Sequence, residues 1–76
     1  MNYQKVVLDK KSTSYLLGSY ISKSGLTFEK IAELLQLNTS RVIYDWLSGK
    51  KMPNVENLYN LALIFNVKME DLLVMR

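Results

Sequence analysis

Residues 27–49 read TFEKIAELLQLNTSRVIYDWLSG, two short helical patterns with a polar break between them. The first pattern has the i, i+3, i+4, i+7 spacing of one helical face, and its members are Phe28, Ile31, Ala32 and Leu35. Thr27 stands directly before it and is a favourable N-cap residue. We therefore predict a helix that begins after Thr27 and a turn at the polar residues 38–40.

The second pattern, from about Thr39 to Ser48, has two chemically different faces. On one face, Ile43, Trp46 and Leu47 follow i, i+3, i+4 and are expected to pack inward. The opposite face is polar, and its residues are Arg41, Tyr44, Asp45 and Ser48. A helix divided in this way is anchored by one side. Its other side offers hydrogen-bond donors and acceptors to base edges in a DNA major groove.

Helical patterns on both sides of this segment predict an all-α class, a compact domain of five short helices. The first helix has Ser12 or Thr13 as its cap and ends at residues 24–25, Ser-Gly. The third ends at Gly49, which adopts the left-handed C-cap conformation without strain. The fourth runs between Asn54, an N-cap residue, and Asn66, which tolerates the left-handed conformation.

The two ends of the chain are less regular. A fifth helix is expected from about Met69 to Val74, with a weak cap because Lys68 precedes it. Residues 1–11 are expected to form an arm or short strand ahead of the domain at residues 12–76. Within this segment, Val6-Val7-Leu8 suits a short strand, an added helical turn or a flexible arm.

The composition excludes several classes of protein. The chain has 76 residues, enough for one domain, and it has neither cysteine nor histidine. Disulfides, thiolate metal sites and the usual nucleophile–base pairs are therefore missing, and we expect no enzyme, metal or cofactor. No apolar run approaches the roughly 20 residues of a membrane span, and the first residues lack a signal-peptide pattern. We expect a soluble protein of the cytoplasm.

The charge is basic and unevenly distributed. The net charge is +3 and the sequence pI is about 9.3, and a pI above about 9 is one mark of nucleic-acid-binding domains. Residues 1–55 carry eight basic and four acidic side chains, whereas residues 56–76 carry two and three. Such a charge also suits ordinary solubility, so its position beside the two-faced helix is the more informative feature.

Contacts to DNA are expected along the two-faced helix and at both of its ends. Hydroxyl and backbone N–H groups at its start suit a phosphate oxygen, and lysines just past its end suit the backbone of the duplex. Arg41 is expected to contact guanine or phosphate, or else to pair with Asp45. Tyr44 is expected to contact DNA or to pack on a neighbouring helix. The candidate DNA-binding residues are Thr27, Phe28, Asn38, Thr39, Ser40, Arg41, Tyr44, Asp45, Lys50 and Lys51.

The segment from Gly25 to Leu73 resembles the lambda-repressor-like, or Xre/Cro-type, helix-turn-helix family. An ordered set of residues carries the resemblance: Leu26-Thr27, Ile31-Ala32, Ile43, Trp46, Ser48-Gly49-Lys50, Pro53, Asn57-Leu58, Leu61-Ala62 and Asp71-Leu72-Leu73. The resemblance implies a sequence-specific transcriptional regulator, often a repressor that acts as a dimer on palindromic sites. Some members of the family are antitoxins.

The sequence departs from the family pattern at the site. Phe28 stands where the family usually has a phosphate-contacting glutamine, and Gln36 stands where the turn usually has glycine. The spacing from Ala32 to Trp46 is one residue longer, as in a minor branch of the family. Asp45 replaces a basic or amide residue, and its carboxylate is repelled by phosphates unless it accepts from cytosine N4 or pairs with a cation. We interpret Asp45 as a residue that discriminates between bases.

The leading interpretation is a regulator that binds double-stranded DNA. Because one small domain makes few base contacts, a homodimer through the fifth helix or the N-terminal segment is expected; otherwise a protein partner supplies the second contact. The alternative is a protein-interaction module, or antitoxin-like partner, on the same fold. Phe28 and Asp45 favour that alternative, whereas Arg41, Lys50 and Lys51 disfavour it.

Overall fold

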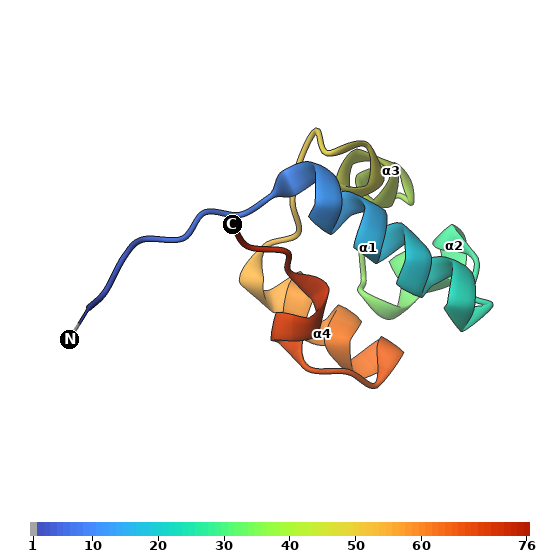
Figure 1. Ribbon diagram of the computed structural model, residues 1–76. Helices are drawn as coiled ribbons and strands as arrows, with labels where there is room; N and C mark the ends of the chain where they lie inside the picture. The colour runs from blue at the N-terminus through green and yellow to red at the C-terminus, as the bar shows by residue number, and fades with distance from the viewer. Residues whose placement is uncertain (1) are drawn as a thin grey trace.

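Four α-helices and one 3-10 helix make up the described part of the chain, residues 2–76 of a computed structural model (Figure 1). They are α1 (Lys10–Ser24), α2 (Phe28–Leu34), α3 (Arg41–Ser48), α4 (Val55–Phe65) and η1 (Met69–Leu72). The predicted all-α class is confirmed, and a count of five holds when η1 is included. Between residues 2 and 76, β structure is limited to one isolated bridge near the chain ends.

Local sequence signals set the ends of the central helices. The side chains of Thr27 and Asn54 accept from the backbone N–H groups of the third residue in α2 and α4, at 3.0 and 2.8 Å, so both predicted N-caps are confirmed. Gly25, Gly49 and Asn66 end α1, α3 and α4 in the left-handed conformation, with φ of 74°, 80° and 57°. These three predicted stops are confirmed as well.

The start of α1 differs from the prediction. The Asp9 carboxylate caps the helix by accepting from the backbone N–H of Ser12 at 3.0 Å. That bond, with smaller effects from the Ser12 hydroxyl, Arg76 and Lys11, lowers the pKa of Asp9 below its ordinary value. The predicted caps, Ser12 and Thr13, are therefore wrong.

The bounds of α3 and of the last helix were also predicted too wide. α3 begins at Arg41 and not at Thr39, because residues 39 and 40 belong to the preceding turn. The last helix ends at Leu72 and not at Val74, because the Val74 N–H donates to the buried Thr13 hydroxyl at 3.0 Å instead of to a helical carbonyl.

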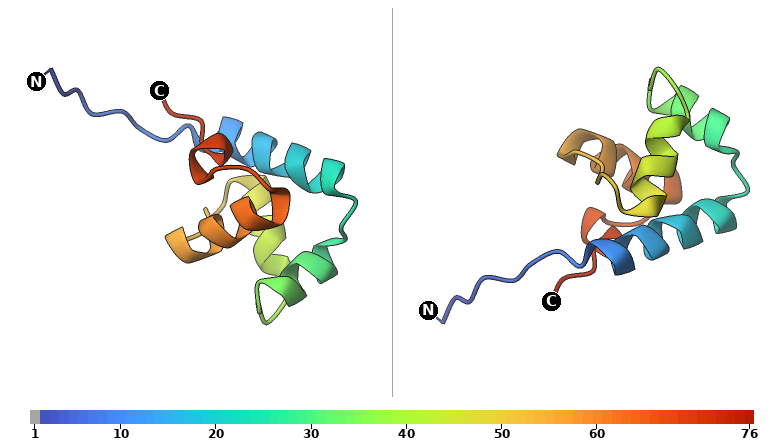
Figure 2. Two further views of the ribbon diagram at one scale, coloured as in Figure 1. Left: turned by 90° about the horizontal axis from the view of Figure 1, so that it is seen from below. Right: turned by 90° about the horizontal axis from the view of Figure 1, so that it is seen from above.

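The chain ends pair with each other. Val7 and Arg76 exchange two backbone hydrogen bonds of 2.9 and 2.8 Å, and the Asp9 N–H donates to the Val74 carbonyl at 2.8 Å. Leu8 and Met75 form the antiparallel bridge between them. Of the three alternatives for residues 6–8, the extended, strand-like form is the one observed. Figures 1 and 2 show the C-terminus beside the segment that leads into α1, whereas residues 2–6 extend away from the helices.

All the helices contribute to one core. α1 packs against α3, α4 and η1, and α4 packs against η1. The buried apolar side chains are Leu17, Ile21, Ile31, Ala32, Ile43, Trp46, Leu58, Leu61, Ala62 and Leu72. On the predicted inner face of α3, Ile43 and Trp46 are buried and Leu47 is half-buried. The core therefore fixes which side of α3 remains accessible.

Gln36 is the one residue of the α2–α3 turn with a left-handed backbone, at φ 57°, and its side chain is exposed. This conformation costs an L-residue about 1–2 kcal/mol. Glycine adopts it with little steric cost, but it loses more conformational entropy on folding, which offsets part of the gain. We predict that Gln36→Gly raises the free energy of unfolding by about 0.5–1 kcal/mol, measured by urea denaturation. Gln36→Ala keeps a Cβ and is the control, for which no gain is expected. An equal gain in both variants would contradict the explanation.

Candidate nucleic-acid interface

An open hollow of about 380 Å³ lies on the outer face of α3. Five of the predicted site residues line it: Thr39, Ser40, Arg41, Tyr44 and Asp45. Arg41 is exposed, the Tyr44 side chain is 54% exposed and Asp45 is half-buried. The structure thus brings half of the predicted set together around one concave, polar surface.

The opposite side of α3 is held by burial and by one hydrogen bond. Ile43 and Trp46 are 0% and 3% exposed. The buried hydroxyl of Ser14, from the second turn of α1, donates to the Trp46 carbonyl at 2.7 Å. Because that carbonyl lies in the last turn of α3, the bond fixes the C-terminal end of the helix against α1.

Phe28 supports Tyr44 from behind. The two rings meet edge to face, with centroids 4.7 Å apart and planes inclined by 80°, an arrangement that the ring quadrupoles favour. Phe28 is half-buried on the first turn of α2. Tyr44 therefore packs on a neighbouring helix, as one of its two predicted alternatives has it, while its contact with DNA stays a prediction.

The N-terminal end of α3 has its own hydrogen bonds. The Thr39 hydroxyl accepts from the Arg41 backbone N–H at 3.2 Å. The Ser40 hydroxyl donates to a carboxylate oxygen of Glu29 at 3.5 Å. Asn38 lies exposed in the same turn. Glu29 was missed by the sequence analysis, because it lies on α2 and only the turn brings it to α3, and it adds a negative charge where phosphate binding was predicted.

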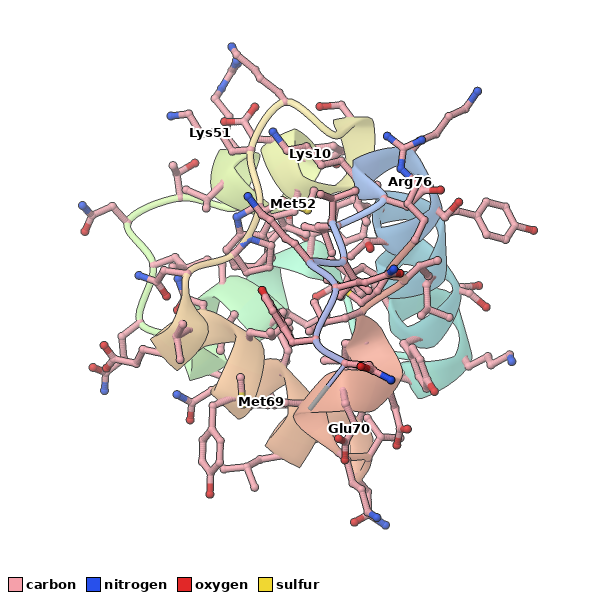
Figure 3. The ribbon with its side chains drawn as sticks, turned by 60° about the vertical axis from the view of Figure 1, so that its left-hand side comes forward. Lys10, Lys51, Met52, Met69, Glu70 and Arg76 are labelled. Atoms are coloured by element: carbon pink, nitrogen blue, oxygen red, sulfur yellow. The ribbon has the colours of Figure 1, made fainter. Side chains whose placement is uncertain are left out.

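Lysines lie around the other end of α3. Lys50 and Lys51 are exposed, and the Lys51 backbone N–H donates to the Asp45 carbonyl at 3.2 Å, which folds the loop back under the helix. A second hollow joins this end of α3 to the first turns of α1, where Lys10 and Lys11 line it. Figure 3 shows Lys10 and Lys51 in the upper part of the view and the acidic Glu70 in the lower part. The sequence analysis missed both α1 lysines.

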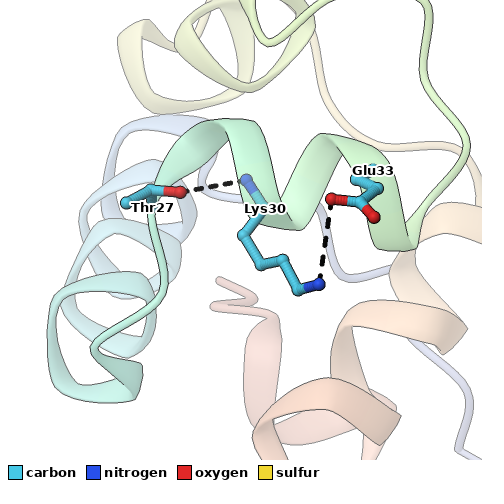
Figure 4. Close-up of polar contacts among 3 residues, drawn as sticks. All are labelled: Thr27, Lys30 and Glu33. Carbon is cyan, nitrogen blue, oxygen red and sulfur yellow. Dashed lines mark hydrogen bonds and ion pairs between the residues drawn. The ribbon is translucent and has the colours of Figure 1, made fainter.

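Arg41 does not pair with Asp45. Among residues 2–76, one ion pair is formed, between Lys30 Nζ and a Glu33 carboxylate oxygen at 3.7 Å on α2 (Figure 4). Figure 4 also shows the Thr27 hydroxyl, which accepts from the Lys30 backbone N–H and so serves α2 as its cap. The Arg41 guanidinium is therefore available to an outside acceptor.

Comparison with known protein families identifies the family of this chain. The family described as helix-turn-helix matches residues 23–72, about two-thirds of the chain. The chain belongs to the Xre, or lambda-repressor-like, helix-turn-helix family. The match spans α2, α3, α4 and η1, which contain the helix-turn-helix segment itself and its supporting helices. A search of the curated proteins finds no match to the chain.

The turn of this helix-turn-helix domain covers the residues between α2 and α3. After α2, the Leu37 N–H donates to the Ala32 carbonyl at 2.9 Å, and the chain passes through residues 38–40 before α3 begins. That this turn is longer than the common form of the family, as the spacing from Ala32 to Trp46 indicates, stays a prediction. Nowhere in the described chain is a helix both long and apolar enough to cross a membrane.

Ser14→Ala removes the hydroxyl that holds the end of α3. Ala is a better helix former than Ser, so Ser22→Ala on the exposed side of α1 is the matched control. We predict that Ser14→Ala is less stable than Ser22→Ala by about 1–1.5 kcal/mol, the net value of one intramolecular hydrogen bond. Chemical denaturation followed by Trp46 fluorescence measures the difference. Equal stabilities would mean that the Ser14–Trp46 bond does not hold α3.

Proposed function

We propose that this helix-turn-helix protein is a transcriptional regulator that binds specific sequences of duplex DNA with α3 in the major groove. The observation that carries the proposal is the hollow on the outer face of α3, opposite the buried Ile43 and Trp46. The groove is about 12 Å wide and admits one helix. A helix anchored on one side and polar on the other meets this requirement.

Each residue of the hollow has a proposed role. Arg41 donates to guanine O6 and N7 or to a phosphate, because it is exposed and unpaired within the described chain. Tyr44, with Phe28 behind it, contacts a thymine methyl group or a phosphate. Asp45 accepts from cytosine N4. The remaining predicted residues contact phosphates, which position the protein on the duplex; they are Thr27, Asn38, Thr39, Ser40, Lys50 and Lys51.

We further propose that the regulator is a homodimeric repressor that acts in the cytoplasm. Two half-sites about 34–36 Å apart would double the few base contacts of one domain. Apolar side chains are exposed in the N-terminal segment and at the chain end that pairs with it: Tyr3 by 75%, Val6 by 57% and Met75 by 46%. These exposed side chains favour the N-terminal segment over the last helix as the dimer surface. A dimer bound to its DNA site would block access of other proteins to that site, which is how a repressor acts.

Selection of bound sites from random duplex DNA tests the proposed function. The expected result is an enriched sequence with two-fold symmetry, bound with an affinity whose logarithm falls with log salt by about 0.9 for each phosphate contacted. Arg41→Ala, a change at an exposed position, is expected to lose that site while keeping its circular dichroism spectrum. The absence of any enriched sequence at low salt would overturn the proposal.

Asp45→Asn tests the role of the carboxylate in the groove. Because removal of this charge reduces repulsion from phosphates, we predict tighter binding to all duplexes and a weaker preference for the selected site. Glu56→Gln makes the same charge change on the exposed surface of α4 and is the control. Binding to randomised sites measures both properties. An unchanged preference in Asp45→Asn would show that Asp45 does not discriminate between bases.

A second candidate is a protein-interaction module on the same fold, which one observation favours. Val55, Tyr59 and Leu63 follow i, i+4, i+8 along α4 and are 75%, 54% and 60% exposed. Such an apolar stripe is typical of a surface that binds protein. Binding to a protein partner that depends on Tyr59 and that persists at high salt would favour this candidate over a DNA-binding function.

A further inference from the structure

The C-terminal end of α3 adjoins a basic surface built from two distant parts of the chain. A hollow of about 600 Å³ lies between the first turns of α1 and this end of α3. Its lining residues are Lys10, Lys11, Ser14, Tyr15, Leu47, Ser48 and Gly49. Lys50 and Lys51 follow directly, so four lysines surround the point where α3 ends.

The position of α1 relative to α3 is fixed at this point. The Ser14 hydroxyl donates to the Trp46 carbonyl at 2.7 Å. Gly49 lies beside Ser14, since a Cβ on Gly49 would be in ordinary van der Waals contact with the Ser14 oxygen, at 3.5 Å. Lys10 and Lys11 lie one turn before Ser14 on the same helix. Their placement beside α3 is therefore set by the packing of the two helices.

The α1 side of the hollow carries groups that suit an anionic ligand. Lys10 and Lys11 are exposed, and Tyr15 is 82% exposed. The Asp9 carboxylate, which caps α1, accepts a hydrogen bond from the Ser12 N–H at 3.0 Å. The Asp45 carboxylate lines the other hollow, on the outer face of α3. Positive charge thus prevails at this end of α3.

We propose that Lys10, Lys11 and Tyr15 of α1 bind the phosphate backbone of the DNA that α3 reads. The lysines contribute charge to phosphate oxygens and the Tyr15 hydroxyl donates a hydrogen bond. This inference rests on the proposed function and extends it to a helix of which the family match, from residue 23, includes only the last two residues. α1 then has two roles, because it holds α3 in place and contacts the duplex beside it.

A charge-matched pair of variants tests the role of α1. The double variant Lys10→Ala/Lys11→Ala and the control Lys23→Ala/Lys68→Ala remove the same charge from exposed positions. Binding to the selected duplex is measured by fluorescence anisotropy over a series of salt concentrations. We expect the α1 variant to lower the magnitude of the salt slope by about 2 and its low-salt affinity by about 10- to 100-fold, with sequence preference unchanged. The control keeps the slope of the original protein.

Tyr15→Phe keeps the ring and removes the hydroxyl, and it is expected to weaken binding several-fold at unchanged thermal stability. Equal salt slopes in the two double variants would overturn the role of α1 while the proposed function stands. No binding of the unaltered protein to any duplex would overturn the proposed function itself, and this inference with it.

Discussion

Trp46 and Ile43 bury one side of α3, and the Ser14 hydroxyl holds the end of that helix through the Trp46 carbonyl. Full burial of a large apolar side chain contributes about 1.5–3 kcal/mol, and the hydrogen bond gives this contact a direction as well as a strength. α3 is thus held at a fixed rotation about its own axis. Without that rotation, Arg41 and Tyr44 would not face the same hollow.

At and before the N-terminal end of α3, by contrast, several features are unfavourable for stability or for phosphate binding. Gln36 adopts a left-handed backbone in the turn that leads to it. Two carboxylates, of Asp45 and Glu29, lie on or beside the surface that is proposed to meet phosphates. Departures from local preference are expected where function, and not stability, sets the sequence. The two carboxylates border the hollow on α3, which agrees with the proposal of a surface that selects its partner at some expense of affinity.

Local sequence patterns were sufficient for most of the helical frame, whereas contacts between distant residues were not. Thr27 and Asn54 act as caps as predicted, because each bonds a backbone group three residues away. Thr13, by contrast, bonds Val74 across 61 positions, and this contact shortens the last helix. The same limit explains the site: the face of α3 follows from helical periodicity, but the approach of Glu29 and of the α1 lysines depends on how the helices pack.

The central claim is that the outer face of α3 is the DNA-binding surface, and NMR tests it most directly. Proton–nitrogen spectra of the ¹⁵N-labelled protein, recorded during titration with a duplex of the selected sequence, report on each backbone amide. The account predicts that the largest shift changes fall on residues 39–51, with Tyr59 and Leu63 of α4 unchanged. Changes confined to the exposed stripe of α4, with α3 unaffected, would contradict it.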